Sequence, residues 1–250
     1  PFRFLNLMRD AYCLVDALGY GSVAAVVGHD FGSPVAADCA LIRPDVFRSV
    51  VLMSAPFVGP PTLYPAAAGE IHAALAALKR PRKHYQWYYT TRPANDDMTK
   101  CPQGVRDFLR AYYHHKSADW HENKPHPLDT WTADELAKMP TYYIMDLGEN
   151  MAETVAKEMP NETQIQACTW LSDDELDIYA QEYVRTGFQG GLNWYRSRTS
   201  LTLNADKALF AGRSIDVPAC FIAGTSDWGI HQVPGAMKKM QLTGCSEFRG

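Results

Sequence analysis

One short stretch, residues 26–36 with the sequence VVGHDFGSPVA, constrains the fold of this chain more than any other. An apolar strand runs directly into a polar apex at Asp30, and a helix is expected to start at once. Gly28 and Gly32 flank that apex at places where a sharp strand-to-helix elbow cannot tolerate side chains. Such an elbow exposes its central side chain as a nucleophile, and the usual occupant is serine. A carboxylate at this apex points to a different chemistry.

Helix and strand patterns alternate around this elbow. Apolar residues recur at helical spacing over residues 7–18, and Gly19 follows as a stop. The apolar runs 22–28 and 48–56 fit strands, the first of them buried on both faces. The helix between them has Ser33 as a candidate cap. Alternating elements at this spacing predict a parallel α/β sheet.

A long insertion follows the second of these strands. Residues 57–214 are aromatic-rich, with helical patterns broken by polar loops. Segments that begin at Thr132 and Ser172 fit a capping box before an apolar run, and Gly187 would end the second helix. An apolar strand then returns within residues 217–227. The insertion is therefore predicted to be a helical lid over the carboxyl ends of the strands, where ligand crevices form.

These patterns predict an α/β fold in which a mostly parallel sheet carries a helical lid. Residues 1–56 and 215–250 are expected to form the core and residues 57–214 the lid. The 250 residues, 46% of them apolar, can bury one large core. The net charge of −4 comes without a basic stripe, which argues against a nucleic-acid partner. No apolar run approaches the roughly 20 residues that span a bilayer.

The cysteine pattern bears on the redox environment of the protein, and the two ends of the sequence bear on the extent of the domain. Six scattered cysteines form no CxxC pair, which favours reduced thiols and a cytoplasmic location. They are Cys13, Cys39, Cys101, Cys168, Cys220 and Cys245. The first residues, PFRFLNLMRD, are not expected to form a signal peptide, and the last, CSEFRG, are expected to approach a strand. We therefore expect both ends of the domain to be missing from this sequence.

Asp30 has two interpretations at the level of local sequence. It can cap the helix that follows, as aspartate often does. Alternatively, the helix dipole and the unpaired N–H groups keep it ionised as a carboxylate nucleophile. Attack by a carboxylate leaves an ester on the enzyme. That chemistry suits substrates attacked at an sp³ carbon, such as epoxides or alkyl halides.

Four segments together resemble the soluble epoxide hydrolases of the α/β-hydrolase superfamily. GHDFG resembles the nucleophile motif of that family, and KHYQWYY resembles its first lid tyrosine segment, with the match on Tyr85. The segment LSDDELDIYAQEYVRTGFQGGLNWYR resembles the second, with the match on Tyr195. VPACFIAGTSDWGIHQVP resembles the strand and loop that carry the charge-relay acid, which matches Asp227. The resemblance spans nearly the whole chain.

This resemblance implies a role for each matched side chain. Asp30 attacks the epoxide, and two phenols, Tyr85 and Tyr195, grip the leaving oxygen and supply its proton. Taken singly, either tyrosine is more often a buried residue with a satisfied hydroxyl, since the chain contains 13 of them. Trp87 and Trp194 are expected to shape an apolar tunnel for the substrate. The chemistry requires no metal and no organic cofactor.

Hydrolysis of the ester requires further groups. The backbone N–H of Phe31 is the expected oxyanion donor, and Asp227 is expected to orient a histidine. The sequence contains neither the upstream His-Gly-x-Pro-like loop nor the histidine that follows the final strand in the family. His231 lies only four residues beyond Asp227, whereas a base normally approaches from a separate loop. His29 is expected to pack under the elbow.

A cluster of histidines in the insertion raises the alternative of a zinc site. It comprises His114, His115, His121 and His126. Their spacing is unlike a standard ligand set, so a solvated lid loop is the preferred interpretation.

The first functional hypothesis is an epoxide hydrolase that acts on a small apolar epoxide. A dehalogenase of the same fold is the first alternative, but it needs halide-binding donors in place of the tyrosine pair. A catalytically inactive binding protein of this fold is the second, favoured by the missing histidine and oxyanion loop. A homodimer is compatible with each hypothesis.

Overall fold

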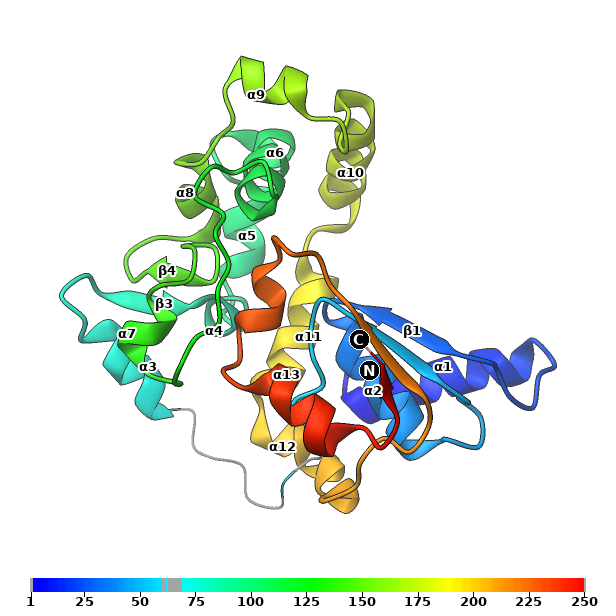
Figure 1. The fold of residues 1–250 in the computed structure, drawn as a ribbon. Coiled ribbons are helices and arrows are strands. Elements are labelled where there is room, and N and C mark those ends of the chain that lie inside the picture. Colours follow the sequence, from blue (N-terminus) through cyan, green and yellow to red (C-terminus); the bar gives the residue numbers. More distant parts are fainter. Residues whose placement is uncertain (1, 60–61, 63–68, 250) are drawn as a thin grey trace. The chain divides into compact units, whose positions relative to one another are not determined.

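The computed structural model describes residues 2–59, 62 and 69–249, which divide into two compact units (Figure 1). Unit 1 comprises Pro1–Ala66, Pro125–Trp131 and Ser200–Gly250. Unit 2 comprises Ala67–Lys124 and Thr132–Thr199. Unit 2 is narrower than the lid expected from the sequence. Pro125–Trp131 lies within the expected lid range but belongs to unit 1. In unit 1, the ring of His126 contacts that of Trp228 at a centroid distance of 5.0 Å.

Unit 1 is built on a sheet of four parallel strands. Their order is β1 (Val26–His29), β2 (Val50–Met53), β5 (Ala219–Ile222) and β6 (Phe248–Arg249). Val50 pairs with Val26 on one side and with Ala219 on the other. The predicted parallel sheet is therefore confirmed.

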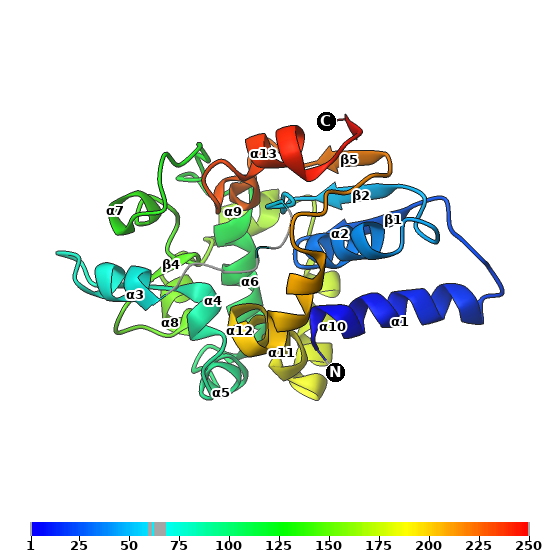
Figure 2. The ribbon, with the colours of Figure 1, turned by 90° about the horizontal axis from the view of Figure 1, so that it is seen from below.

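Several helices and helical turns accompany this sheet in unit 1. They are α1 (Phe4–Ala17), α2 (Gly32–Ile42), α12 (Leu201–Asn204), the 3-10 turns η1 (Ala205–Phe210) and η2 (Trp228–His231), α13 (Ala236–Lys239) and the π-helical turn η3 (Met240–Gly244). Figure 2 shows α2 alongside β1 and β2, and α13 alongside β5. Ala36, Ala37 and Ala40 of α2 are fully buried in one cluster with Val50 and Leu52. Small residues allow the helix backbone to lie close to the strands, which places the start of α2 directly against the end of β1.

Two sequence-based expectations around β1 are wrong. Val27 is 61% exposed, because it alternates along β1 with Gly28, which faces α2, and the opposite face of β1 is open among the described residues. Ser33 does not cap α2, whose N-cap residue is Phe31. The Ser33 hydroxyl instead donates to the carbonyl oxygen of Ala55 at 2.6 Å, which joins α2 to the segment after β2.

Unit 2 is mostly helical. Its helices are α3 (Gly69–Ala76), α4 (Tyr85–Tyr88), α5 (Ala94–Thr99), α6 (Gly104–Lys116), α7 (Ala133–Leu136), α8 (Met151–Ala156), α9 (Glu162–Ala167), α10 (Asp173–Thr186) and α11 (Gln189–Thr199). The capping box predicted at Ser172 is present at the start of α10, and Gly187 ends that helix with a φ of 66°. Asp173, in the first turn of α10, accepts hydrogen bonds from Arg106 and Arg110 of α6. These charge-assisted contacts tie the two helices together.

Unit 2 also contains a two-stranded antiparallel ladder that the sequence patterns do not predict. It consists of β3 (Arg82–His84) and β4 (Ile144–Asp146). Each strand is three residues long, which is too short for an alternating pattern to be visible. Asp146 accepts from Arg80 at 2.6 Å and from Arg82 at 2.8 Å, so charge pairing supports the ladder. The ladder sets the direction in which the chain enters α4.

Candidate active site

The elbow between β1 and α2 holds Asp30 in a strained conformation. Its φ is 51°, a left-handed value that few residues other than glycine adopt. Its backbone N–H donates to the carbonyl oxygen of Met53 at 3.1 Å, and its own carbonyl accepts from the Ser33 N–H at 3.1 Å. Holding a residue in this region costs on the order of 1–3 kcal/mol, which the surrounding contacts must offset. Because Phe31 is the N-cap of α2, Asp30 lies before the capping position, and its interpretation as a simple helix cap is wrong.

The two glycines beside Asp30 differ in what they allow. A β-carbon on Gly28 would lie 2.2 Å from the carbonyl oxygen of Gly32 and 2.8 Å from the β-carbon of Ala36, so this position requires glycine. A β-carbon on Gly32 would meet no atom within 4 Å. The expectation that both positions exclude side chains is therefore confirmed for Gly28 and wrong for Gly32. The crowding arises because the Gly32 backbone itself occupies the space beside Gly28.

Asp227 follows β5 and is oriented by two hydrogen bonds. Its carboxylate accepts from the backbone N–H of Gly229 at 2.6 Å and from the hydroxyl of Ser54 at 2.5 Å. Ser54 is buried and also has a left-handed φ, of 67°. A β-carbon on Gly229 would lie 2.5 Å from the Ser54 hydroxyl oxygen, so glycine is needed there as well. Ser54 and Gly229 thus hold the acid in one orientation.

Asp30, Ser54 and Asp227 lie at one edge of the sheet. Each follows the carboxyl end of a strand, and the three strands β1, β2 and β5 are consecutive neighbours. Backbone hydrogen bonds continue past the strands, since Asp30 donates to Met53 and Ser54 donates to Ile222 at 3.0 Å. Sequence reasoning missed Ser54, although a polar residue directly after a buried parallel strand is a signal for this edge.

The histidines of unit 1 lie in different surroundings. His29 is exposed, so its expected packing under the elbow is wrong. His231 is half-buried at the end of η2, with its ring 6.3 Å from that of Trp228. Burial and the nearby His126 lower the pKa of His231, while Asp227 acts in the opposite direction. His231 therefore favours its neutral form more than an ordinary histidine does.

Unit 2 brings Tyr85 and Tyr195 together. The ring of Tyr85, in the first turn of α4, lies 5.7 Å from that of Tyr195 in α11. The Arg196 guanidinium, next in sequence, donates to the carbonyl oxygens of Thr90 and Thr91 at 3.2 Å each and fastens α11 to the turn after α4.

The first turn of α4 is itself anchored. The Tyr85 N–H donates to the carbonyl of Tyr143 at 2.9 Å, and the ring nitrogen of His84 accepts from the Gln86 N–H at 3.3 Å. Burial, with the nearby His72 and Arg198, lowers the pKa of His84 to about 3, which keeps this nitrogen available as an acceptor. The amide of Gln86 donates to the Tyr85 hydroxyl oxygen at 3.2 Å. A lone pair of that oxygen is thereby engaged, and the hydroxyl hydrogen is directed away from Gln86.

Of the two tryptophans expected to shape a tunnel, Trp194 contacts the tyrosine pair and Trp87 contacts histidine rings. The ring of Trp194 is buried 5.1 Å from that of Tyr195, with the Arg198 guanidinium over it at 5.5 Å. Trp87 has ring contacts with His72 at 4.0 Å and with His84 at 5.1 Å. Aromatic side chains therefore surround the tyrosine pair within unit 2.

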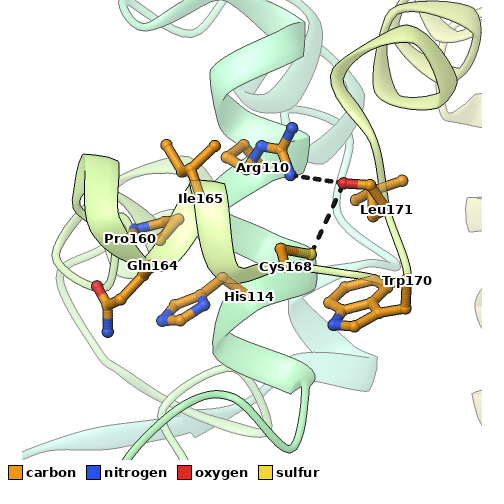
Figure 3. A pocket seen from close by; sticks show the side chains of 8 residues that line it. All are labelled: Arg110, His114, Pro160, Gln164, Ile165, Cys168, Trp170 and Leu171. Atoms are coloured by element: carbon orange, nitrogen blue, oxygen red, sulfur yellow. Dashed lines mark hydrogen bonds between the residues drawn. The ribbon is translucent and has the colours of Figure 1, made fainter.

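A small pocket elsewhere in unit 2 has no part in this arrangement. Figure 3 shows Arg110 and Cys168 both directed at the carbonyl oxygen of Leu171, at 3.2 and 3.6 Å. Its cavity volume of about 10 Å³ suits a single water molecule. His114 lines this pocket and, like His115, is buried in α6, so the expected solvated loop is wrong for both. Within residues 2–59, 62 and 69–249, no three His, Cys, Asp or Glu side chains are grouped to hold a metal ion.

The sequence pattern of the alpha/beta hydrolase fold family matches residues 1–243. The chain belongs to the α/β-hydrolase family. The observed sheet agrees with that assignment, since the elbow aspartate and the Asp227 loop follow the parallel strands β1 and β5, which lie on either side of β2. In the part of this α/β-hydrolase that the structure describes, no helix is both long and apolar enough to cross a bilayer.

Curated relatives and solved structures of similar sequence carry epoxide hydrolase names. Epoxide hydrolase B of Mycobacterium tuberculosis is 26% identical over 96% of this chain and 68% of its own length. Epoxide hydrolase A of the same organism is 52% identical over 59 residues, which are 23% of this chain and 17% of that protein. An epoxide hydrolase from an endophytic Streptomyces superposes with a TM-score of 0.72 at 27% identity, covering 98% of this α/β-hydrolase and 65% of the other chain. This chain thus spans about two thirds of the length of that solved structure.

Proposed function

We propose that this α/β-hydrolase opens an epoxide with water to a vicinal diol, through a covalent ester on Asp30. The observation that carries the proposal is a carboxylate, instead of a hydroxyl, at the strained apex between β1 and α2. A carboxylate attacks an sp³ carbon and forms an alkyl ester. The names of the relatives support an epoxide as the electrophile.

In the first step, a carboxylate oxygen of Asp30 forms a bond to one epoxide carbon, and that carbon's bond to the ring oxygen breaks. The electron pair of the broken bond stays on the oxygen as a developing alkoxide. Tyr85 and Tyr195 donate hydrogen bonds to this oxygen, and one of them transfers its proton. Their 5.7 Å ring separation supports a shared role, because two phenols this close can address one oxygen.

In the second step, water adds to the ester carbonyl, and the backbone N–H of Phe31 stabilises the resulting oxyanion. The bond between the Asp30 carbonyl carbon and the oxygen of the alkyl group then breaks, and the leaving oxygen takes the remaining proton of the added water, which releases the diol and regenerates the carboxylate. The proton taken up by the base returns to the tyrosinate formed in the first step. Asp227 orients the histidine that takes the proton of the water, and this sequence does not contain the histidine that follows the final strand in the family that it resembles. The fixed orientation of Asp227 between Ser54 and Gly229 supports that role.

The aromatic surroundings of the tyrosine pair, including Trp87 and Trp194, favour a small apolar epoxide as substrate. All six cysteines are free thiols, which supports a reducing, cytoplasmic environment.

Mass spectrometry of the intact chain after incubation with styrene oxide tests the first step. The expected result is one added epoxide mass on the peptide that contains Asp30, and none in Asp30→Asn. An alkyl chloride of similar size serves as a matched control, and an adduct with the chloride alone would favour the dehalogenase alternative. A folded sample that shows neither an adduct at Asp30 nor release of the diol would contradict the proposal and support a binding protein of this fold.

A further inference from the structure

The ring of Tyr89 contacts both proposed proton donors. It lies 5.7 Å from the ring of Tyr85 in an edge-to-face arrangement and 5.0 Å from that of Tyr195. Together with the 5.7 Å contact between Tyr85 and Tyr195, these distances form a closed triangle of three rings. Tyr89 follows Tyr85 by one helical turn, and its N–H donates to the Tyr85 carbonyl at 2.9 Å. The third ring is therefore fixed to the backbone that carries the first.

A hydroxyl pair anchors this third ring to another helix. The hydroxyl groups of Tyr89 and Tyr112 lie 3.3 Å apart, and Tyr112 belongs to α6. Tyr89 is only 5% exposed, so its hydroxyl needs a protein partner. Burial, with Tyr112 and Tyr195 nearby, raises its pKa well above the ordinary value, so Tyr89 stays protonated and neutral. A phenylalanine would fill the same space without a polar group to satisfy, but it would lack this link to α6.

We infer that Tyr89 is a positioning residue that sets the separation and orientation of Tyr85 and Tyr195. Its ring restricts the rotation of the rings of Tyr85 and Tyr195. Its hydroxyl bond to Tyr112 fixes the position of the three rings relative to α6. The catalytic consequence of this inference rests on the proposed function, whereas the positioning itself is a property of unit 2. Small displacements of reacting groups cost roughly 10²-fold in rate, which makes such a support consequential.

Three variants distinguish the effect of the Tyr89 ring from the effect of its hydroxyl group. Tyr89→Leu removes the ring, whereas Tyr89→Phe keeps it and removes only the bond to Tyr112. Tyr112→Phe removes the same bond from the other side, so the two phenylalanine variants should act alike and their combination should add little. Tyr183→Leu is a matched control, because it removes a ring that stacks on Phe188 at 4.3 Å in unit 2.

The first measurement does not depend on activity. In protein labelled with ¹³C at the hydroxyl-bearing ring carbon of tyrosine, the Tyr85 and Tyr195 resonances are assigned by their absence in Tyr85→Phe and Tyr195→Phe. Tyr89→Leu should shift both resonances, and Tyr89→Phe should shift them less. Tyr183→Leu should leave them in place. Unchanged resonances in a folded Tyr89→Leu would overturn the inference, and if that variant does not fold, shifts shared by Tyr89→Phe and Tyr112→Phe decide the question.

The second measurement is the single-turnover rate of Asp30 alkylation. Tyr89→Leu should lower the saturating rate by roughly 10²-fold, with the half-saturating epoxide concentration little changed. A normal saturating rate in Tyr89→Leu would overturn the inference. If the unaltered chain forms neither an adduct nor the diol, the proposed function fails, and the resonance shifts alone decide whether Tyr89 positions its neighbours.

Discussion

Asp30 and Ser54 in unit 1 are placed by the backbone, whereas Tyr85 and Tyr195 in unit 2 are placed by other side chains. The two unit 1 residues have φ values of 51° and 67° at the ends of neighbouring strands. The two tyrosines lie in α4 and α11 with ordinary helical backbone, and ring contacts locate them. A backbone clash leaves no low-energy alternative, whereas packed rings can shift by small amounts. Substitutions should therefore act as all-or-none changes around Asp30 and as graded changes around the tyrosines.

The largest expected effect distinguishes the two glycines of the elbow. Gly28→Ala should destabilise unit 1 by at least about 3 kcal/mol or prevent folding, because its β-carbon would lie 2.2 Å from backbone. Gly32→Ala should change the free energy of unfolding by less than about 1 kcal/mol, because that position is open and alanine favours helix. Urea unfolding of both variants provides the comparison. Equal stabilities would show that the elbow can relax and that the backbone does not hold Asp30 rigidly.

The next effect concerns the tyrosine pair. Tyr85→Phe and Tyr195→Phe should each slow the single-turnover alkylation of Asp30 by roughly 10²- to 10³-fold, about 3 kcal/mol, since each removes one donor to the developing alkoxide. The double variant should be nearly inert, while both single variants remain folded. Normal alkylation rates in both single variants would remove the tyrosines from the proposed mechanism.

Substitutions of Ser54 test whether its backbone strain and its hydrogen bond to Asp227 contribute separately to the free energy of unfolding. Ser54→Ala loses the bond to Asp227 and keeps a left-handed backbone, so it should lower the free energy of unfolding by about 1–3 kcal/mol. Ser54→Gly loses the same bond, but glycine adopts this φ without strain, so the loss should be smaller by up to about 1 kcal/mol. Urea unfolding at neutral pH measures both. A glycine variant less stable than the alanine variant would show that the left-handed φ carries no strain.

The smallest effect is an acid sensitivity of unit 2. Hydrogen bonds from Arg80, and from Arg82 next, lower the pKa of Asp146 from its ordinary 3.8 to about 2. A depressed folded-state pKa stabilises the protein above pH 4, and this contribution is lost as pH falls from about 4 toward 2. Asp146→Asn should therefore be less stable at pH 7 by about 1–2 kcal/mol, with a smaller difference at pH 3. Urea unfolding at the two pH values measures this, and an equal deficit at both would assign the loss to packing.

The sequence alone determined the local features of the structure. The stretch GHDFG predicts a tight turn with Asp30 at its apex, and the structure has that turn, because the strand, the glycine at 28 and the following helix are all contiguous. The capping box at Ser172 and the stop at Gly187 were equally predictable, since each depends on bonds within one helical turn. Tyr85 and Tyr195 were found through resemblance to a family, because no local pattern distinguishes them among 13 tyrosines.

Tertiary structure alone decided which distant groups meet. Ser54 and Asp227 are 173 positions apart, and their bond exists because β2 and β5 are neighbours in the sheet. The same holds for Tyr89 and Tyr112, whose hydroxyl contact depends on how α6 packs within unit 2. Burial of His114 and His115 likewise followed from α6, not from the polar composition of their surroundings. Chain-distant contacts depend on the packing of whole elements, and a spacing pattern within one segment carries no information about it.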